Sequence, residues 1–128
     1  MGVFKRVLCR ERLRKIPPQF SWIDHRLVRD RHIGRVSTQA LALYLFLATV
    51  ADAEGLSYYS DPAIARIVRL NLPEIAQARQ ELLAAQLIAY SHPLYQVLGL
   101  DTPNNAQSRH NQTLPLGQIL KSLEHAHD

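Results

Sequence analysis

The sequence contains few of the residues that build disulfide frameworks, phosphate-binding loops or membrane spans. Cysteine occurs once, at Cys9, so the chain cannot form an internal disulfide, and we expect a reducing, cytoplasmic setting. The longest apolar run, residues 40–51 with one threonine, is well short of the roughly 18 residues that cross a bilayer. The five glycines form no glycine-rich phosphate loop. We therefore expect neither a membrane partner nor a nucleotide cofactor.

Catalytic and metal-binding constellations are also absent. No paired-carboxylate motif occurs, and no base is fixed beside Cys9 to activate its thiol. His125 and His127 have the spacing of a metal-ligand pair, but no cysteine or carboxylate cluster completes a site around them. We therefore expect a protein that is not an enzyme and binds neither a metal nor a cofactor.

What the sequence does contain is the composition of one globular domain with a lopsided charge. Of its 128 residues, 47% are apolar and 20% are charged, and the net charge is +4. Residues 1–35 hold ten Lys or Arg against three carboxylates, a net of +7, which leaves −3 for the rest of the chain. Such a basic third suits a polyanion, and nucleic acid is the commonest one inside cells. The alternative is a solvated basic face that only aids solubility.

The pattern along the chain divides it into four parts. We expect a basic arm at 1–19, a folded domain at 20–100, a polar linker at 101–113 and a short amphipathic helix at 114–128. The last part carries four apolar residues that share one helical face: Leu116, Ile119, Leu120 and Leu123.

The first long helix of the domain is predicted by its cap and by its composition. Ser37 is a good N-cap for the alanine- and leucine-rich stretch that follows, which we expect to be helical as far as Ala51. A helix that is apolar all round must be covered on all sides, so it forms the centre of the core. Gly55 is well placed to take the left-handed conformation after the helix end.

Two further helices have clear start signals. Residues 60–62, Ser-Asp-Pro, begin a short helix at 63–68. After a tight turn, Asn71 and Glu74 form a capping box for a third helix, at about 72–85. The residues expected to be buried in these two helices are Ile64, Ala65, Ile67, Val68, Ile75, Ala78 and Leu82.

Shorter elements flank the three helices. We expect Phe20, Trp22 and Ile23 to begin the compact part, and residues 25–30 to form a helical turn with Leu27 and Val28 pointing inward. Gly34 ends that turn.

Residues 87–90 and 94–98 read as two strands joined by the turn 91–93. The fold class is therefore mainly α with a small β-hairpin, an α+β domain.

This order of elements and several short phrases carry a resemblance to a known family. The phrases are TQALALYLFLA at 38–48, YSDPAIA at 59–65, NLPEI at 71–75 and ELLAAQLI at 81–88. With helix, helix, tight turn, helix and hairpin in this order, the chain resembles the winged helix-turn-helix domains of plasmid and phage replication initiators and related mobile-element regulators.

The resemblance implies a non-catalytic DNA-binding domain that serves replication, transposition or transcriptional regulation of a mobile element. In such domains the helix after the tight turn enters the major groove. Two features depart from the pattern. Gln86 stands where the family usually has glycine, and the third helix lacks the usual serine, threonine and arginine residues at its start.

If the chain binds DNA in this way, each expected contact has a chemical reason. A carboxamide can both donate to and accept from adenine, so we expect Gln77 and Gln80 to read bases, and Arg79 to address guanine or phosphate. Arg66 and Arg69 would hold phosphates. The full expected set is Lys5, Arg6, Arg10, Arg12, Arg14 and Lys15 in the arm, and Arg66, Arg69, Asn71, Gln77, Arg79 and Gln80 in the second and third helices.

Two alternatives stay open at this stage. The polar residues of the third helix also suit an ordinary solvated face, and its charges, Glu74, Arg79 and Glu81, sum to −1. That charge suits a protein partner at least as well as phosphates, so the chain could instead be a protein-interaction module within a larger nucleic-acid machine. A homodimer is expected through the terminal helix or the apolar first helix.

Overall fold

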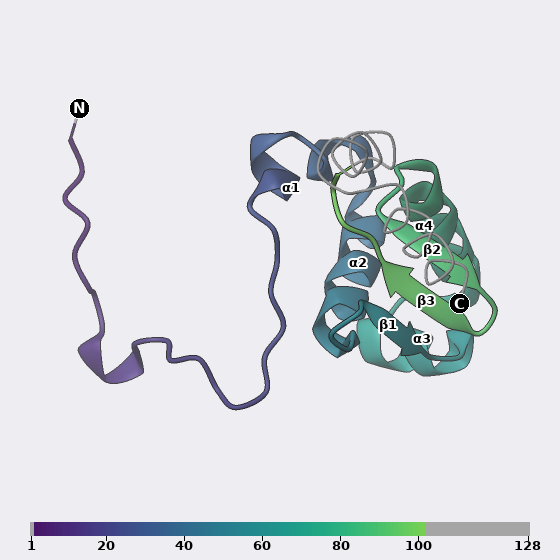
Figure 1. Cartoon of the computed structure of the whole chain (residues 1–128), viewed down its shortest axis with the longest axis horizontal. Coiled ribbons are helices and arrows are strands. Elements are labelled where there is room, and N and C mark those ends of the chain that lie inside the picture. Colours follow the sequence, from purple (N-terminus) through teal and green to yellow (C-terminus); the bar gives the residue numbers. More distant parts are fainter. Residues whose placement is uncertain (1, 102–128) are drawn as a thin grey trace, which may run out of the picture.

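Residues 2–101 are described by the computed structural model, which mixes helices with a small antiparallel sheet, as the sequence predicts (Figure 1). The helices are α1 (Arg26–Arg29), α2 (Thr38–Val50), α3 (Asp61–Val68) and α4 (Leu72–Ala84), with 3-10 turns at Arg10–Arg12 and Ile33–Arg35. The strands are β1 (Leu56–Tyr58), β2 (Ile88–Ser91) and β3 (Leu94–Val97). The predicted terminal helix at 114–128, and the linker from 102 onward, lie outside the described residues.

Helix α2 forms the centre of the core. The Ser37 hydroxyl caps it, accepting a hydrogen bond from the Ala40 N–H at 3.2 Å. The helix packs against α3, α4 and β3, and Leu43 and Leu47 on it are fully buried. The prediction that α2 is covered on all sides is wrong at Leu45, which is 55% exposed, because these elements leave one side of the helix open.

Helix α4 begins where predicted, and α3 begins at Asp61, two residues before the predicted start at 63. Ser60 caps α3, and Asn71 with Glu74 forms the predicted capping box at the start of α4. The buried face of α4 carries Ile75, Ala78 and Leu82 toward α2, as expected. In α3, only Ile64 is fully buried.

Several apolar residues lie further outside than predicted. Ile67 is 57% exposed and Val28 is 68% exposed, since α3 and α1 are short helices that bury a single narrow face. Phe20, Trp22 and Ile23 are 51–73% exposed, so the compact part begins after them rather than with them. Gly34 does not end α1, because Arg31 takes the left-handed conformation there instead, at φ 63°.

The sheet has the order β1-β3-β2, with both pairs antiparallel. Strands β2 and β3 form the predicted hairpin, and Tyr95 on β3 is fully buried against the helices. Strand β1 was not predicted. It is three residues long and pairs with a strand nearly forty residues later, so no local alternation reveals it.

Two left-handed residues shape the connections. Gly55 has φ 86°, as predicted, and a Cβ there would lie 2.6 Å from the carbonyl oxygen of Val97. Gln86 has φ 61° at the end of α4, a conformation that favours glycine.

Candidate nucleic-acid interface

The turn between α3 and α4 is held by backbone caps on both sides. Arg69 ends α3 in the left-handed conformation, and its N–H donates to the Ala65 carbonyl. Asn71 then starts α4: its side-chain oxygen accepts from the Glu74 N–H at 2.8 Å, and Glu74 accepts from the Asn71 N–H at 2.8 Å. Because that oxygen serves the cap, any contact of Asn71 with DNA would use its amide NH₂ group.

The exposed face of α4 forms an uncharged stripe. Its members lie three, four, seven and eleven residues after the first of them, so they share one side of the helix. They are Pro73, Ala76, Gln77, Gln80 and Ala84, all exposed. The stripe thus presents two carboxamides among small side chains, and we name it the α4 stripe.

The charged residues of α4 have partners within the domain, and one of them, Glu81, also forms a side-chain hydrogen bond with Gln77 of the stripe. Glu74 closes the capping box. Glu81 accepts hydrogen bonds from the Ser37 N–H at 2.7 Å and from the Ser37 hydroxyl at 3.1 Å, which joins α4 to the start of α2. The Ser37 backbone and then its hydroxyl, with a smaller contribution from Gln77, lower the pKa of Glu81. The net charge of −1 counted in the sequence therefore does not describe the exposed face.

Arg79 is also directed inward, which corrects its expected place at the interface. Its guanidinium donates to Asp61 at 2.9 and 3.3 Å and to the Tyr95 hydroxyl at 2.8 Å, and it stacks over the Tyr90 ring at 4.7 Å from the centroid. Its side chain is only 15% exposed. Burial lowers the pKa of Arg79, but the hydrogen bonds to Asp61 and Tyr95 raise it by more, so the side chain stays charged. We therefore exclude Arg79 from the candidate interface.

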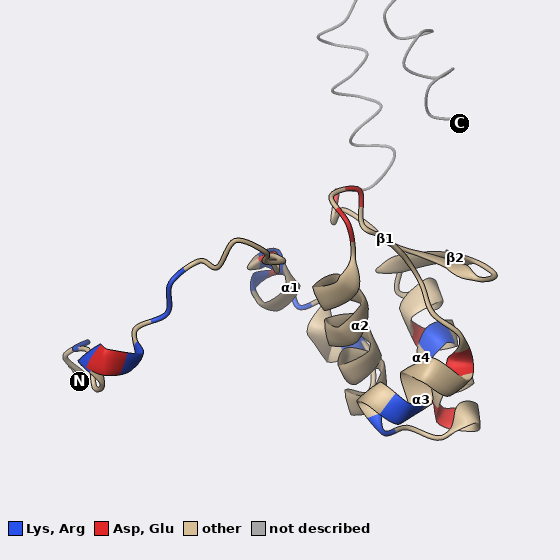
Figure 2. Ribbon diagram, turned by 90° about the horizontal axis from the view of Figure 1, so that it is seen from below, with Lys and Arg blue, Asp and Glu red and all other residues tan. Residues whose placement is uncertain are grey.

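Arg66 and Arg69 are exposed at the end of α3, as predicted. Neither side chain forms an ion pair or hydrogen bond with another described residue. Both guanidinium groups are therefore available to an external anion beside the turn that leads into α4. Figure 2 shows these cations on α3 and on the turn after it.

The β2–β3 hairpin carries no cation of its own. No lysine or arginine occurs between residues 80 and 101, and the tip consists of Ser91, His92 and Pro93. The Tyr90 hydroxyl lies 3.0 Å from Nδ1 of His92. The hairpin therefore offers polar groups to a ligand, but no fixed positive charge.

The arm supplies the strongest positive charge in the described part of the chain. It leads away from the domain in Figure 1, and one hydrogen bond, from the Ser21 hydroxyl to the Thr49 carbonyl at 2.8 Å, ties its base to α2. Its six cations are all exposed and form no ion pair with a described residue: Lys5, Arg6, Arg10, Arg12, Arg14 and Lys15. They are therefore free to contact a polyanion.

Residues 2–101 contain neither a cluster of metal-ligating side chains nor a membrane-spanning helix. No group of three or more His, Cys, Asp and Glu side chains is arranged to hold a metal ion, and His125 and His127 lie outside that range. No helix within it has the length and apolar character to span a membrane.

The structure thus places the expected DNA-contacting residues in two separate regions. It excludes one of these residues, Arg79, from both. Gln77 and Gln80 share the α4 stripe, and Arg66 and Arg69 lie beside its start, whereas the arm stands apart. Sequence reasoning misplaced Arg79 because its partners come from α3 and from the sheet. Comparison with protein families, with characterised proteins and with solved structures finds no match for this chain.

Proposed function

We propose that this chain is a DNA-binding winged helix-turn-helix domain, with α4 as the helix that enters the major groove and the β2–β3 hairpin as the wing. In this proposal it carries no catalytic chemistry and serves replication, transposition or transcriptional control of a mobile element. The order of helices and strands and the tight α3–α4 turn support the fold assignment.

The α4 stripe is the observation that carries this proposal. A helix that approaches DNA must not present carboxylates to the phosphates, and both carboxylates of α4 are turned to partners inside the domain. What remains outside is a pair of carboxamides, Gln77 and Gln80, which can bind adenine through two hydrogen bonds. The net charge of −1 on α4 is therefore only a weak argument for a protein partner.

Phosphate contacts come from two regions in this proposal. Arg66 and Arg69 would fix the position of α4 on the duplex, since phosphate contacts orient a protein without reading sequence. The six arm cations would add affinity along the backbone or in a minor groove. The wing has no cation, so it would contribute only polar contacts.

A second candidate function, a protein-interaction module, is favoured by one observation. The arm exposes large apolar side chains, among them Phe4 at 91% and Leu8 at 86%. Such side chains are typical of protein contacts rather than of phosphate contacts. The two functions are compatible if the partner is another copy of the chain.

Selection from a random duplex library tests the DNA-binding proposal. The wild-type protein should enrich a defined motif, and Gln77→Ala with Gln80→Ala should lose the preference at one or two A·T positions, at about 1–3 kcal/mol each, while retaining non-specific binding. Gln39→Ala changes an exposed glutamine outside α4 and should leave the motif unchanged. No enrichment by the wild type, or the same motif from the double variant, would rule out base reading by α4.

A further inference from the structure

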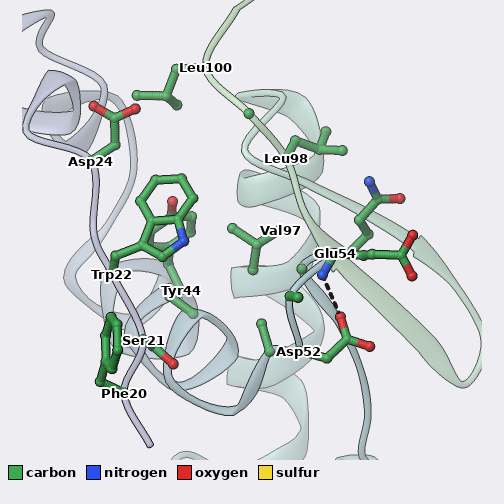
Figure 3. A pocket seen from close by; sticks show the side chains of 16 residues that line it. Phe20, Ser21, Trp22, Asp24, Tyr44, Asp52, Glu54, Val97, Leu98 and Leu100 are labelled. Carbon is green, nitrogen blue, oxygen red and sulfur yellow. Dashed lines mark hydrogen bonds between the residues drawn. The ribbon is translucent and has the colours of Figure 1, made fainter. Parts of the chain in front are cut away.

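A groove of about 450 Å³ opens between the base of the arm and the ends of α2 and β3 (Figure 3). Its walls mix apolar and polar side chains, and they come from three parts of the chain that are far apart in sequence. The residues that form them include Phe20, Trp22, Tyr44, Val97, Leu98 and Leu100. Trp22 forms one wall and is 73% exposed, so the groove has an aromatic side chain with nothing over it.

One edge of this groove is acidic. Asp52 and Glu54 lie in the loop after α2, shown red in Figure 2, and neither forms an ion pair with a described residue. The Asp52 carboxylate holds the loop by accepting from the N–H groups of Glu54 and Leu56, both at 2.9 Å. The groove therefore combines apolar side chains with two carboxylates that form no ion pair with a described residue, which suits an apolar and basic ligand.

The arm has the complementary character. Between residues 3 and 16, six cations and one carboxylate give a net charge of +5. The same segment exposes six large apolar side chains by 46–91%: Val3, Phe4, Val7, Leu8, Leu13 and Ile16. This apolar content is higher than that of a segment suited to stay in solvent.

The arm of the same chain is poorly placed to fill the groove. Pro17 and Pro18 come directly before the wall formed by Phe20 and Trp22, and proline keeps this stretch extended. The arm accordingly leads away from the domain in Figure 1. A return into its own groove would need a tight reversal just before that wall, whereas the groove of another molecule is reachable without one.

The domain as a whole is close to neutral, so the attraction for a basic partner is local to the groove. Residues 17–101 hold seven cations and eight carboxylates, a net of −1, and Asp52 and Glu54 at the groove edge attract the +5 segment of another copy. If each arm occupies the groove of the other copy, the two contacts are identical and the assembly is closed by a two-fold axis.

We propose that residues 3–16 of one copy dock in the groove of a second copy, forming a homodimer by reciprocal exchange of arms. The apolar pairs Val3-Phe4 and Val7-Leu8 flank the pair Lys5-Arg6, so this short segment offers apolar side chains to the groove and cations to its acidic edge. The inference concerns self-association in the absence of DNA, so it stands or fails separately from the proposed function.

Fluorescence energy transfer gives a direct test, because the chain has a single tryptophan and a single cysteine. Trp22 is the only tryptophan and lies in the groove, and Cys9 is the only cysteine and lies in the arm. Chains with Cys9→Ser serve as fluorescence donors, and chains with Trp22→Phe, labelled at Cys9 with a thiol-reactive acceptor, serve as acceptors. Energy transfer in the mixture can then arise only between chains. We expect quenching of Trp22 emission on mixing, and a mass by light scattering of twice 14.6 kDa.

Leu8→Ser in the acceptor chain should abolish the transfer and, placed in both chains, shift the mass to that of a monomer. Leu8 is 86% exposed, so its substitution spares the folded domain. Val28→Ser, at an exposed apolar residue outside the arm and the groove, should change neither readout. Three results would each overturn the proposal: a dimer without energy transfer, energy transfer that survives Leu8→Ser, or a monomer at every concentration. This holds whether the groove is then empty or occupied by residues 102–128.

Discussion

At the scale of single residues, Arg79 shows how a surface-type side chain becomes part of the core. It comes from α4, yet its partners are Asp61 at the start of α3, Tyr90 on β2 and Tyr95 on β3. The guanidinium thus joins three elements at one point. Sequence spacing places Arg79 between Gln77 and Gln80, but nothing local indicates these partners, since they are 11 to 18 residues away.

Replacement of Arg79 should therefore reduce stability rather than DNA recognition. Arg79→Ala leaves the buried Tyr95 hydroxyl and the Asp61 carboxylate without their donor, and we expect a loss of about 1–3 kcal/mol in the free energy of unfolding. Urea denaturation followed by circular dichroism measures it. Gln80→Ala on the α4 stripe is the matched control and should change stability by less than about 0.5 kcal/mol. Equal stability of both variants would contradict this structural role.

Glu81 predicts a pH dependence. Its pKa is lowered in the folded protein by the hydrogen bonds from Ser37, so its contribution to stability is present above the pKa of the unfolded chain and is lost as the pH falls. The difference in urea midpoint between wild type and Glu81→Gln should be largest at pH 7 and shrink between about pH 5 and 3. Glu54→Gln, at an exposed carboxylate without a described partner, should show no such trend. A pH-independent difference for Glu81→Gln would refute the contribution of the charge.

At the scale of elements, caps were predicted well and long-range pairing was not. Ser37, Ser60 and the Asn71–Glu74 box act within one helical turn, so the sequence reveals them; α2 and α4 begin where predicted, and α3 begins two residues earlier than predicted. Strand β1 is defined by its ladder with β3, and the groove by three segments distant in sequence. The exposure of Leu45 and Ile67 likewise depends on which neighbours are present, and periodicity does not show that.

The pairing of β1 with β3 depends on Gly55. The backbone there is left-handed, and its carbonyl accepts from the Val97 N–H at 2.8 Å, so β3 passes very close. Gly55→Ala adds a Cβ into the Val97 carbonyl and should cost about 1–3 kcal/mol in the free energy of unfolding. Gly34→Ala meets no atom within 4 Å and is the control, expected to be near neutral in the same thermal or urea denaturation. Comparable costs for both would argue against this close approach.

At the scale of the whole molecule, charge and apolar surface are divided between the arm and the domain. The arm holds free cations and exposed apolar side chains, and the domain holds the α4 stripe and an acidic groove. The proposed DNA-binding dimer would account for all four features: the grooves would take the apolar side chains of the arms, and the duplex would take the cations and the stripe.

The measurement that tests DNA binding most directly is the salt dependence of affinity for a labelled mixed-sequence duplex, for wild type and for a variant with Arg10, Arg12, Arg14 and Lys15 changed to alanine. Each lost phosphate contact should flatten the slope of log K against log salt by about 0.9, so the variant should lose up to about 3.6. Arg29→Ala, at an exposed arginine outside the arm and the α3–α4 region, controls for a general change in charge. A steep slope that flattens in the arm variant alone is the predicted result. No binding by the wild type at low salt would contradict the account.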